Sequence, residues 1–192
     1  MAHRWTKSKS PEEQRLDALH RYGISYQSPE RSFDLLAGGL AKLYSTPFAL
    51  VTFMDAKHQY VKAASGLEMQ TIALASSFCQ YLLTSTGALI IGDATQDERV
   101  MALSVVTGLP GIRFYAGAPI WSSDGFQIGS VCVLDTVSRD PETVDPSYLL
   151  HFAHMAQAVL EHRQGGNQGV LTFQSYQQRR AEEVKAGGGR TS

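Results

Sequence analysis

The sequence predicts an α+β domain built on a central antiparallel sheet of five or six strands. Residues 112–121 and 126–134 are rich in apolar, aromatic and β-branched side chains, and the turn signal Asp124-Gly125 separates them. Apolar residues occupy both alternation phases of these runs, which is typical of strands covered on both faces. The expected strands are joined mostly by hairpin links, which favours an antiparallel sheet. We expect terminal helices on one face of the sheet and short cap helices on the other.

The composition of the chain argues against several classes of function. The chain has 192 residues, 18% of them charged, and a net charge of -1, so it offers no field that would attract nucleic acid or an anionic membrane. No apolar run approaches the roughly 20 residues of a spanning helix, and no secretory signal is present. Two cysteines cannot form a disulfide framework. We therefore expect a cytoplasmic protein with neither nucleic-acid nor membrane partners.

Three segments are expected along the chain. Residues 1–9 are polar and are predicted to form a flexible tail, whereas residues 10–164 carry the periodic apolar patterns of a folded domain. Residues 165–192 contain few apolar anchors, which predicts a flexible or weakly helical tail.

The domain is predicted to begin with two helices. Residues 10–13 read Ser-Pro-Glu-Glu, a capping box with proline at the first helical position, and this helix is expected to stop at Gly23. A second helix is predicted to start with Ser28 as its cap and Pro29 at its first position. Apolar residues then repeat at helical spacing until Thr46-Pro47 ends the pattern.

The middle of the chain alternates strands and short helices. Residues 48–54 and 59–64 are predicted to form a hairpin, and residues 66–75 show no firm period and are predicted as a loop. Ser76 is predicted to cap a short helix that ends near Ser85. A short strand is expected at residues 89–91.

Two more helices are expected. Thr95 and Glu98 form a second capping box, which predicts a helix from there to about Thr107. After the central hairpin, Asp145-Pro146 opens a last long helix with an apolar stripe.

Several runs of the sequence resemble those of a GAF domain, of the type found beside histidine kinases and diguanylate cyclases. The runs are RLDALHRYGI, PFALVTFMDAKHQY, SSFCQYLL, IIGDATQDERV and GIRFYAGAPIWSSDGFQIGSVCVLD. They extend in order from about residue 12 to residue 163. The resemblance implies a PAS-like antiparallel sheet with a pocket between the sheet and the cap helices. With no output domain expected in the remainder, the module is expected to stand alone.

The resemblance implies a non-catalytic sensory or regulatory module in signal transduction, which binds a small ligand and forms a homodimer through its terminal helices. Two alternatives stay open. One is a thiol-dependent redox protein, either like a methionine sulfoxide reductase or a redox sensor, that uses Cys79. The other is a purely structural dimerisation module whose pocket is filled by its own side chains.

Departures from enzymatic and pigment-binding relatives argue against a catalytic or cofactor-bearing domain. Reductases with this fold use several cooperating cysteines, whereas the two cysteines here lie on different elements and do not match that spacing. Bilin-binding relatives attach pigment through a Cys-His pair, and here Gln80 follows Cys79. No cyclic-nucleotide signature is evident. We therefore expect no cofactor, and the histidines at 151 and 154 lack the partners of a metal site.

The strongest site candidate is Arg113, a charge inside a strand that is expected to be buried on both faces. It shares an alternation phase with Tyr115, so both side chains are expected on one face. Such a charge must be paired or face a wet cavity. Two readings stay open: the guanidinium binds a carboxylate or phosphate of a small ligand, or it forms an internal salt bridge to Asp93 or Asp97.

Four further residues complete the predicted site. Asp93 and Arg99 flank the start of the predicted helix at 95–107, where free N–H groups favour an anion, although capping alone accounts for Thr95 and Glu98. Phe78 and Cys79 are expected to reach the same pocket from the cap helix. Cys79 is either a reactive thiol or a buried apolar residue. The candidate ligand-binding residues are therefore Phe78, Cys79, Asp93, Arg99, Arg113 and Tyr115.

Overall fold

A computed structural model of the chain describes residues 8–24 and 29–163, and it shows a six-stranded sheet in the order β3-β2-β1-β6-β5-β4. All neighbouring strands are antiparallel, which confirms the predicted fold class. The strands are β1 (Phe48–Met54), β2 (His58–Ser65), β3 (Thr71–Ala73), β4 (Leu89–Ile91), β5 (Phe114–Trp121) and β6 (Gln127–Asp135). The predicted cap Ser28 and most of the two predicted tails lie outside the described residues.

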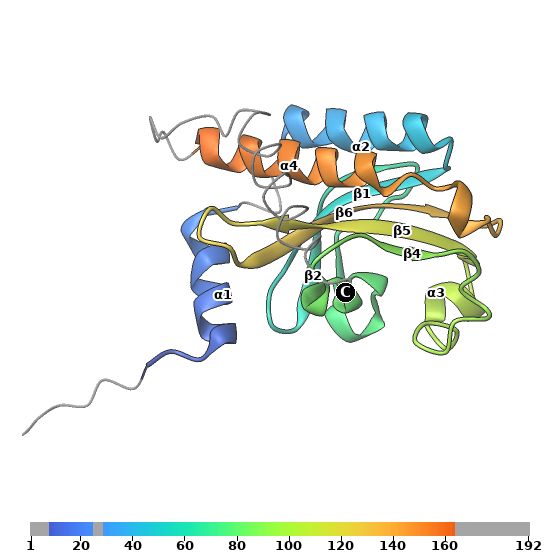
Figure 1. Cartoon of the computed structure of the whole chain (residues 1–192), viewed down its shortest axis with the longest axis horizontal. Coiled ribbons are helices and arrows are strands. Elements are labelled where there is room, and N and C mark those ends of the chain that lie inside the picture. The colour runs from blue at the N-terminus through green and yellow to red at the C-terminus, as the bar shows by residue number, and fades with distance from the viewer. Residues whose placement is uncertain (1–7, 25–28, 164–192) are drawn as a thin grey trace, which may run out of the picture.

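Helices cover both faces of this sheet (Figure 1). The α-helices are α1 (Pro11–Arg21), α2 (Arg31–Tyr44), α3 (Ser104–Thr107) and α4 (Pro146–Arg163), and the 3-10 helices are η1 (Leu74–Ser76), η2 (Phe78–Thr84) and η3 (Pro141–Thr143). The long helices α2 and α4 lie side by side on one face, and η2 and α3 lie on the other. The expected covering of one face by long helices, including the terminal helix α4, and of the other by short cap helices is confirmed, whereas α1 packs at one end of the sheet.

Helix α1 packs at the end of the sheet that carries the β5–β6 turn (Figure 1). Its Ser10 cap forms the predicted capping box with Glu13. The buried Arg15 donates to the carbonyl oxygens of Met54, at 2.7 Å, and Gln127, at 3.3 Å. A guanidinium therefore ties α1 to the ends of two central strands, β1 and β6.

The β5–β6 hairpin lies in the middle of the sheet, as predicted from its two apolar phases. Strand β6 is flanked by β1 and β5, and β5 by β6 and β4. Gly125 adopts a φ of +83° in the turn, a conformation that glycine reaches without strain. Both faces of these strands are buried because a separate core packs on each.

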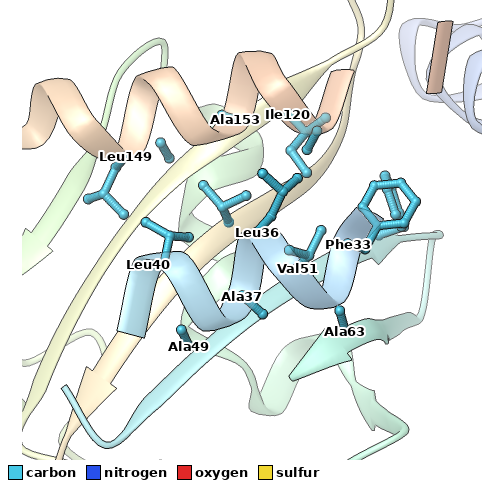
Figure 2. Close-up of a cluster of buried hydrophobic side chains, with 14 of the residues drawn as sticks. Phe33, Leu36, Ala37, Leu40, Ala49, Val51, Ala63, Ile120, Leu149 and Ala153 are labelled. Atoms are coloured by element: carbon cyan, nitrogen blue, oxygen red, sulfur yellow. The ribbon is translucent and has the colours of Figure 1, made fainter. Parts of the chain in front are cut away.

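The core on the helical face joins α2, α4 and the sheet (Figure 2). Alternate residues of β5 point into it. The buried side chains that Figure 2 labels are Phe33, Leu36, Ala37, Leu40, Ala49, Val51, Ala63, Ile120, Leu149 and Ala153. Tyr115, one residue along from Phe114, belongs to the core on the opposite face, under η2.

Three expectations about local structure were wrong. Residues 71–73, expected in a loop, form β3 because they pair with β2. The cap of η2 is Ser77, whose side chain accepts the Cys79 N–H, and not Ser76. Helix α2 begins at Arg31 rather than Pro29, and the carboxylate of Glu30 pairs with Lys62 instead of capping the helix.

The helix expected from Thr95 to Thr107 is also absent: turns fill most of this stretch, and α3 covers only its last four residues. The reason is local competition. The Asp93 carboxylate accepts both the N–H and the hydroxyl of Thr95, at 2.9 and 2.7 Å, so Thr95 does not cap a helix.

Candidate functional site

Five of the six predicted site residues separate into two places. Phe78, Cys79 and Tyr115 belong to the core between η2 and the sheet. Asp93 and Arg99 line an open cleft at the end of β4. Arg113 belongs to neither place and lies immediately before β5.

In the first place, side chains fill the space between η2 and β5. The rings of Phe78 and Tyr115 stack with centroids 4.9 Å apart and planes 8° from parallel. The Cys79 Sγ lies 3.4 Å from the Tyr115 hydroxyl, and all three side chains are buried. These residues therefore pack against one another and do not line an open pocket.

A glycine in β5 makes room for this packing. A Cβ placed at Gly117 would collide with the Tyr115 hydroxyl and come within 3.2 Å of the Cys132 Cβ. Gly117 is also the strand partner of Cys132 across the β5–β6 pair. The tyrosine hydroxyl thus lies over the sheet, close to both cysteines.

The protonation of these groups is coupled. Hydrogen bonding from the Cys132 thiol, against the opposing effect of burial, lowers the pKa of Cys79 to about 6, and Ser130 and Tyr115 act in the same direction. The same hydrogen bond, together with burial, raises the pKa of Cys132 well above its usual value. Burial and the two neighbouring thiols raise the pKa of Tyr115. The cluster therefore favours one thiolate, on Cys79, between protonated donors.

Buried polar side chains surround the two thiols. Ser77 donates to the Gln59 side-chain oxygen and accepts the Cys79 N–H at 2.9 Å. Across the sheet, the hydroxyls of Thr52 and Ser130 are 2.9 Å apart. The sequence analysis did not identify Cys132 as a neighbour of Cys79. The register of β1, β5 and β6, which brings these residues together, becomes apparent only once the strands are paired.

The second place is an open cleft of about 820 Å³ between the end of β4, the turns that follow it and the segment before η3. Its walls are Ile90, Ile91, Gly92, Asp93, residues 96–99 and residues 138–141. The Arg99 guanidinium pairs with Asp97, with Nε 2.8 Å from the carboxylate, and lies 5.9 Å from the centroid of the Tyr81 ring. Arg139 also lines the cleft and pairs with Asp135.

Arg113 departs from its predicted setting. Strand β5 begins at Phe114, so Arg113 does not lie in a strand that is covered on both faces, and its side chain is half-buried. Its Nη1 donates to the carbonyl oxygens of Val106 and Ile112, at 3.0 and 3.1 Å. Within the described residues it forms no salt bridge with Asp93 or Asp97, the internal partners considered from the sequence. Hydrogen bonds from Thr95, and more weakly the charge of Arg113, lower the pKa of Asp93.

One buried polar side chain was not singled out from the sequence. The amide of Gln127, at the start of β6, has neither its oxygen nor its nitrogen hydrogen-bonded among the described residues. Its backbone carbonyl accepts from Arg15, and its strand partner is Trp121. In the same described ranges, no group of three or more His, Cys, Asp or Glu side chains could hold a metal ion.

The chain was compared with known protein families and with individual proteins. No model of a known protein family matches the chain. Over 141 residues, 73% of its length, the chain is 33% identical to a cyclic di-GMP phosphodiesterase of Pseudomonas aeruginosa. It spans only 24% of that relative.

Solved structures share the fold at low sequence identity. The GAF domain of an Acinetobacter phosphoenolpyruvate-protein phosphotransferase is 15% identical, with a TM-score of 0.57, and the match covers 79% of this chain and 96% of that one. The corresponding GAF domain from Coxiella burnetii is 13% identical, with a TM-score of 0.58 and coverage of 82% and 99%.

A third solved structure with this fold is the free methionine-R-sulfoxide reductase of Neisseria meningitidis in complex with its substrate, with a TM-score of 0.58. It is 16% identical, and the match covers 85% of this chain and 98% of that one.

Among residues 8–24 and 29–163, no helix is both long and apolar enough to cross a membrane. The chain is thus a domain with the GAF fold, related in sequence to a segment of a cyclic di-GMP phosphodiesterase.

Proposed function

We propose that the chain is a non-catalytic sensory or regulatory module of signal transduction, which binds a small ligand in the cleft at the end of β4 and dimerises. This proposal is supported mainly by the GAF fold together with the 141-residue similarity to part of a cyclic di-GMP phosphodiesterase. Because that similarity spans 24% of the relative, it supports a role as one part of a signalling protein and not phosphodiesterase activity.

The cleft supports ligand binding by its size and position. Its volume of about 820 Å³ lies within the range of small-molecule sites, about 300–1,000 Å³. A protein with the same fold, the Neisseria reductase, holds its substrate in the solved structure, so the fold is compatible with a bound small molecule. By contrast, the space under η2 is occupied by the chain's own side chains.

The charge of the cleft indicates which ligands it favours. The acidic residues of its walls are Asp93, Asp97, Glu98 and Asp140, and the basic ones are Arg99 and Arg139. Both guanidinium groups are already paired with carboxylates, one of them inside the cleft. The anionic ligand considered from Arg113 would therefore meet excess negative charge here. A ligand that carries a cationic group or several hydrogen-bond donors fits better.

A screen of small cations tests this site. We expect amines and guanidinium compounds, with spermidine and agmatine as named probes, to raise the melting temperature more than cyclic di-GMP or inorganic phosphate do. Glu98→Gln should raise the Kd for the better probe about fivefold, because one exposed charge contact is worth about 1 kcal/mol. Glu142→Gln, an exposed acid of η3 outside the cleft walls, is the matched control. Equal shifts in Kd for the two variants would contradict binding in the cleft. If none of the probes raised the melting temperature, the purely structural module would be favoured.

Dimerisation is proposed through the outer side of α2 and α4. Four large apolar side chains on these helices face solvent: Leu35, Leu43, Tyr148 and Met155, which are 65%, 47%, 46% and 51% exposed. Exposed apolar surface of this kind marks interaction sites. A two-fold contact would use the same patch from each copy.

Sedimentation velocity over a concentration series tests the dimer. The native chain should sediment as a dimer at micromolar concentration. Leu35→Glu combined with Met155→Glu should raise the dissociation constant by at least tenfold, because each buried carboxylate opposes association. Leu109→Glu changes an exposed leucine away from both helices and should leave the dimer intact. A native chain that stays monomeric at high micromolar concentration would remove this part of the proposal.

A further inference from the structure

Two thiols from distant parts of the chain meet under η2. Cys79 lies on η2, and Cys132 lies on β6, which contacts η2 in the described structure. They are the only cysteines of the sequence, and both are buried. The Tyr115 hydroxyl places them near each other: it lies 3.4 Å from the Cys79 Sγ, and a Cβ at Gly117 would meet both this hydroxyl and, at 3.2 Å, the Cys132 Cβ. The fold thus builds a thiol pair that the spacing in the sequence does not reveal.

The surroundings of the pair distinguish the two sulfur atoms. Cys79 is approached by the Tyr115 hydroxyl at 3.4 Å, and its backbone N–H is fixed on Ser77 at 2.9 Å. Donors around Cys79 favour its thiolate, the nucleophilic form, while Cys132 keeps its proton. The Cys79 sulfur is therefore the nucleophile of the pair, and the Cys132 sulfur remains a protonated thiol.

We propose that Cys79 and Cys132 are a peroxide-oxidisable dithiol that closes into a disulfide between η2 and β6. The inference goes beyond the proposed sensory function and does not rest on it. The oxidant is a small hydroperoxide, with hydrogen peroxide as the simplest member of the class.

The reaction proceeds in two balanced steps. The Cys79 thiolate attacks one oxygen of hydrogen peroxide: an S–O bond forms, the O–O bond breaks, and the departing hydroxide takes up a proton to become water. Cys132 then attacks the Cys79 sulfenic sulfur: the S–S bond forms, the S–O bond breaks, and the hydroxide leaves as water with the Cys132 proton. Two thiols lose two electrons and two protons in total, and one peroxide becomes two waters.

Tyr115 has a positioning role in this scheme. Its hydroxyl, which stays protonated because its pKa is raised, donates toward the Cys79 sulfur. The stacked ring of Phe78 holds Tyr115 in place. Closing the disulfide would fasten η2 to the sheet, so oxidation would stiffen the covering of this face.

Burial sets the range of usable oxidants. Cys79 is 2% exposed and Cys132 is fully enclosed, so a reagent must pass between η2 and the sheet. A small molecule such as hydrogen peroxide passes more readily than a bulky one. We therefore expect hydrogen peroxide to oxidise the pair at least tenfold faster than cumene hydroperoxide does.

The test uses the full reduced chain treated with hydrogen peroxide and analysed by non-reducing peptide mapping. The expected product is an intramolecular Cys79–Cys132 disulfide, 2 Da lighter than the reduced chain. Its rate of formation should rise with pH, reach half of its plateau near pH 6 and level off above that, because the thiolate is the attacking form and the pKa of Cys79 is lowered to about 6. Dithiothreitol should restore both thiols.

Three variants assign the roles, each checked for folding by circular dichroism. Cys132→Ser should stop at a sulfenic acid that dimedone traps on Cys79, and Cys79→Ser should leave Cys132 reduced. Tyr115→Phe should move the pH midpoint upward while retaining the disulfide. The mapping of the native chain needs no variant, so the proposal stays testable if one fails to fold. Two intact thiols after excess peroxide, or a disulfide only between chains, would overturn it.

Discussion

Replacing Phe33 with alanine should lower the free energy of unfolding by about 3–5 kcal/mol, the usual cost of removing a fully buried aromatic ring. Phe33 lies on α2 (Figure 2) and is fully buried. Its ring meets the Phe53 ring edge-to-face, with centroids 5.9 Å apart. The Lys62 ammonium lies 6.0 Å from the ring centroid. The substitution therefore removes both the ring contact with Phe53 of the sheet and the cation–π contact with Lys62.

Urea unfolding followed by circular dichroism measures this loss. Lys42→Ala, at an exposed position of the same helix, is the matched control and should change stability by less than about 0.5 kcal/mol. Because small domains are stable by only about 5–15 kcal/mol, the Phe33→Ala chain should be close to unfolding at 37 °C. A loss below about 1 kcal/mol would mean that α2 does not pack on the sheet as described.

Elements with a strong local signal were predictable from the sequence. The central hairpin combines two apolar phases with an Asp-Gly turn, and α1 combines a capping box with proline at its first position. Strand β3 has neither signal: its three residues become a strand through pairing with β2. The helix expected at 95–107 failed because Asp93, two residues earlier, binds Thr95 and so removes the cap. A capping motif does not reveal that a neighbouring side chain competes for the capping residue.

The candidate site was predictable only in part, because its contacts are non-local. The burial of Cys79 and Tyr115 follows from their apolar surroundings, but their meeting with Cys132 depends on strand register. Arg113 was assigned to a buried strand because the apolar run begins at Ile112, whereas the strand begins two residues later. The open cleft is formed by segments before η3 and after β4, and no sequence pattern joins them.

Arg139 links three parts of the fold at the cleft. Its guanidinium bonds the Asp135 carboxylate, with Nε at 3.1 Å, and the carbonyl oxygens of Tyr44 and Ser45, both at 2.7 Å. It also lies 5.2 Å from the centroid of the Phe114 ring. A cation at this position satisfies the C-terminal carbonyls of α2 and holds the cleft wall against the sheet.

Arg139→Ala should therefore destabilise the domain by about 2–3 kcal/mol, because the Asp135 carboxylate, whose side chain is 10% exposed, loses its charged partner. Arg139→Lys should recover only part of this loss, since one ammonium cannot reproduce a planar, multidentate contact. The decisive measurement is a double-mutant cycle with Asp135→Asn by urea unfolding. Coupling predicts that the double variant is more stable than the sum of the single losses by at least about 1 kcal/mol, and strictly additive losses would show that the two side chains act independently.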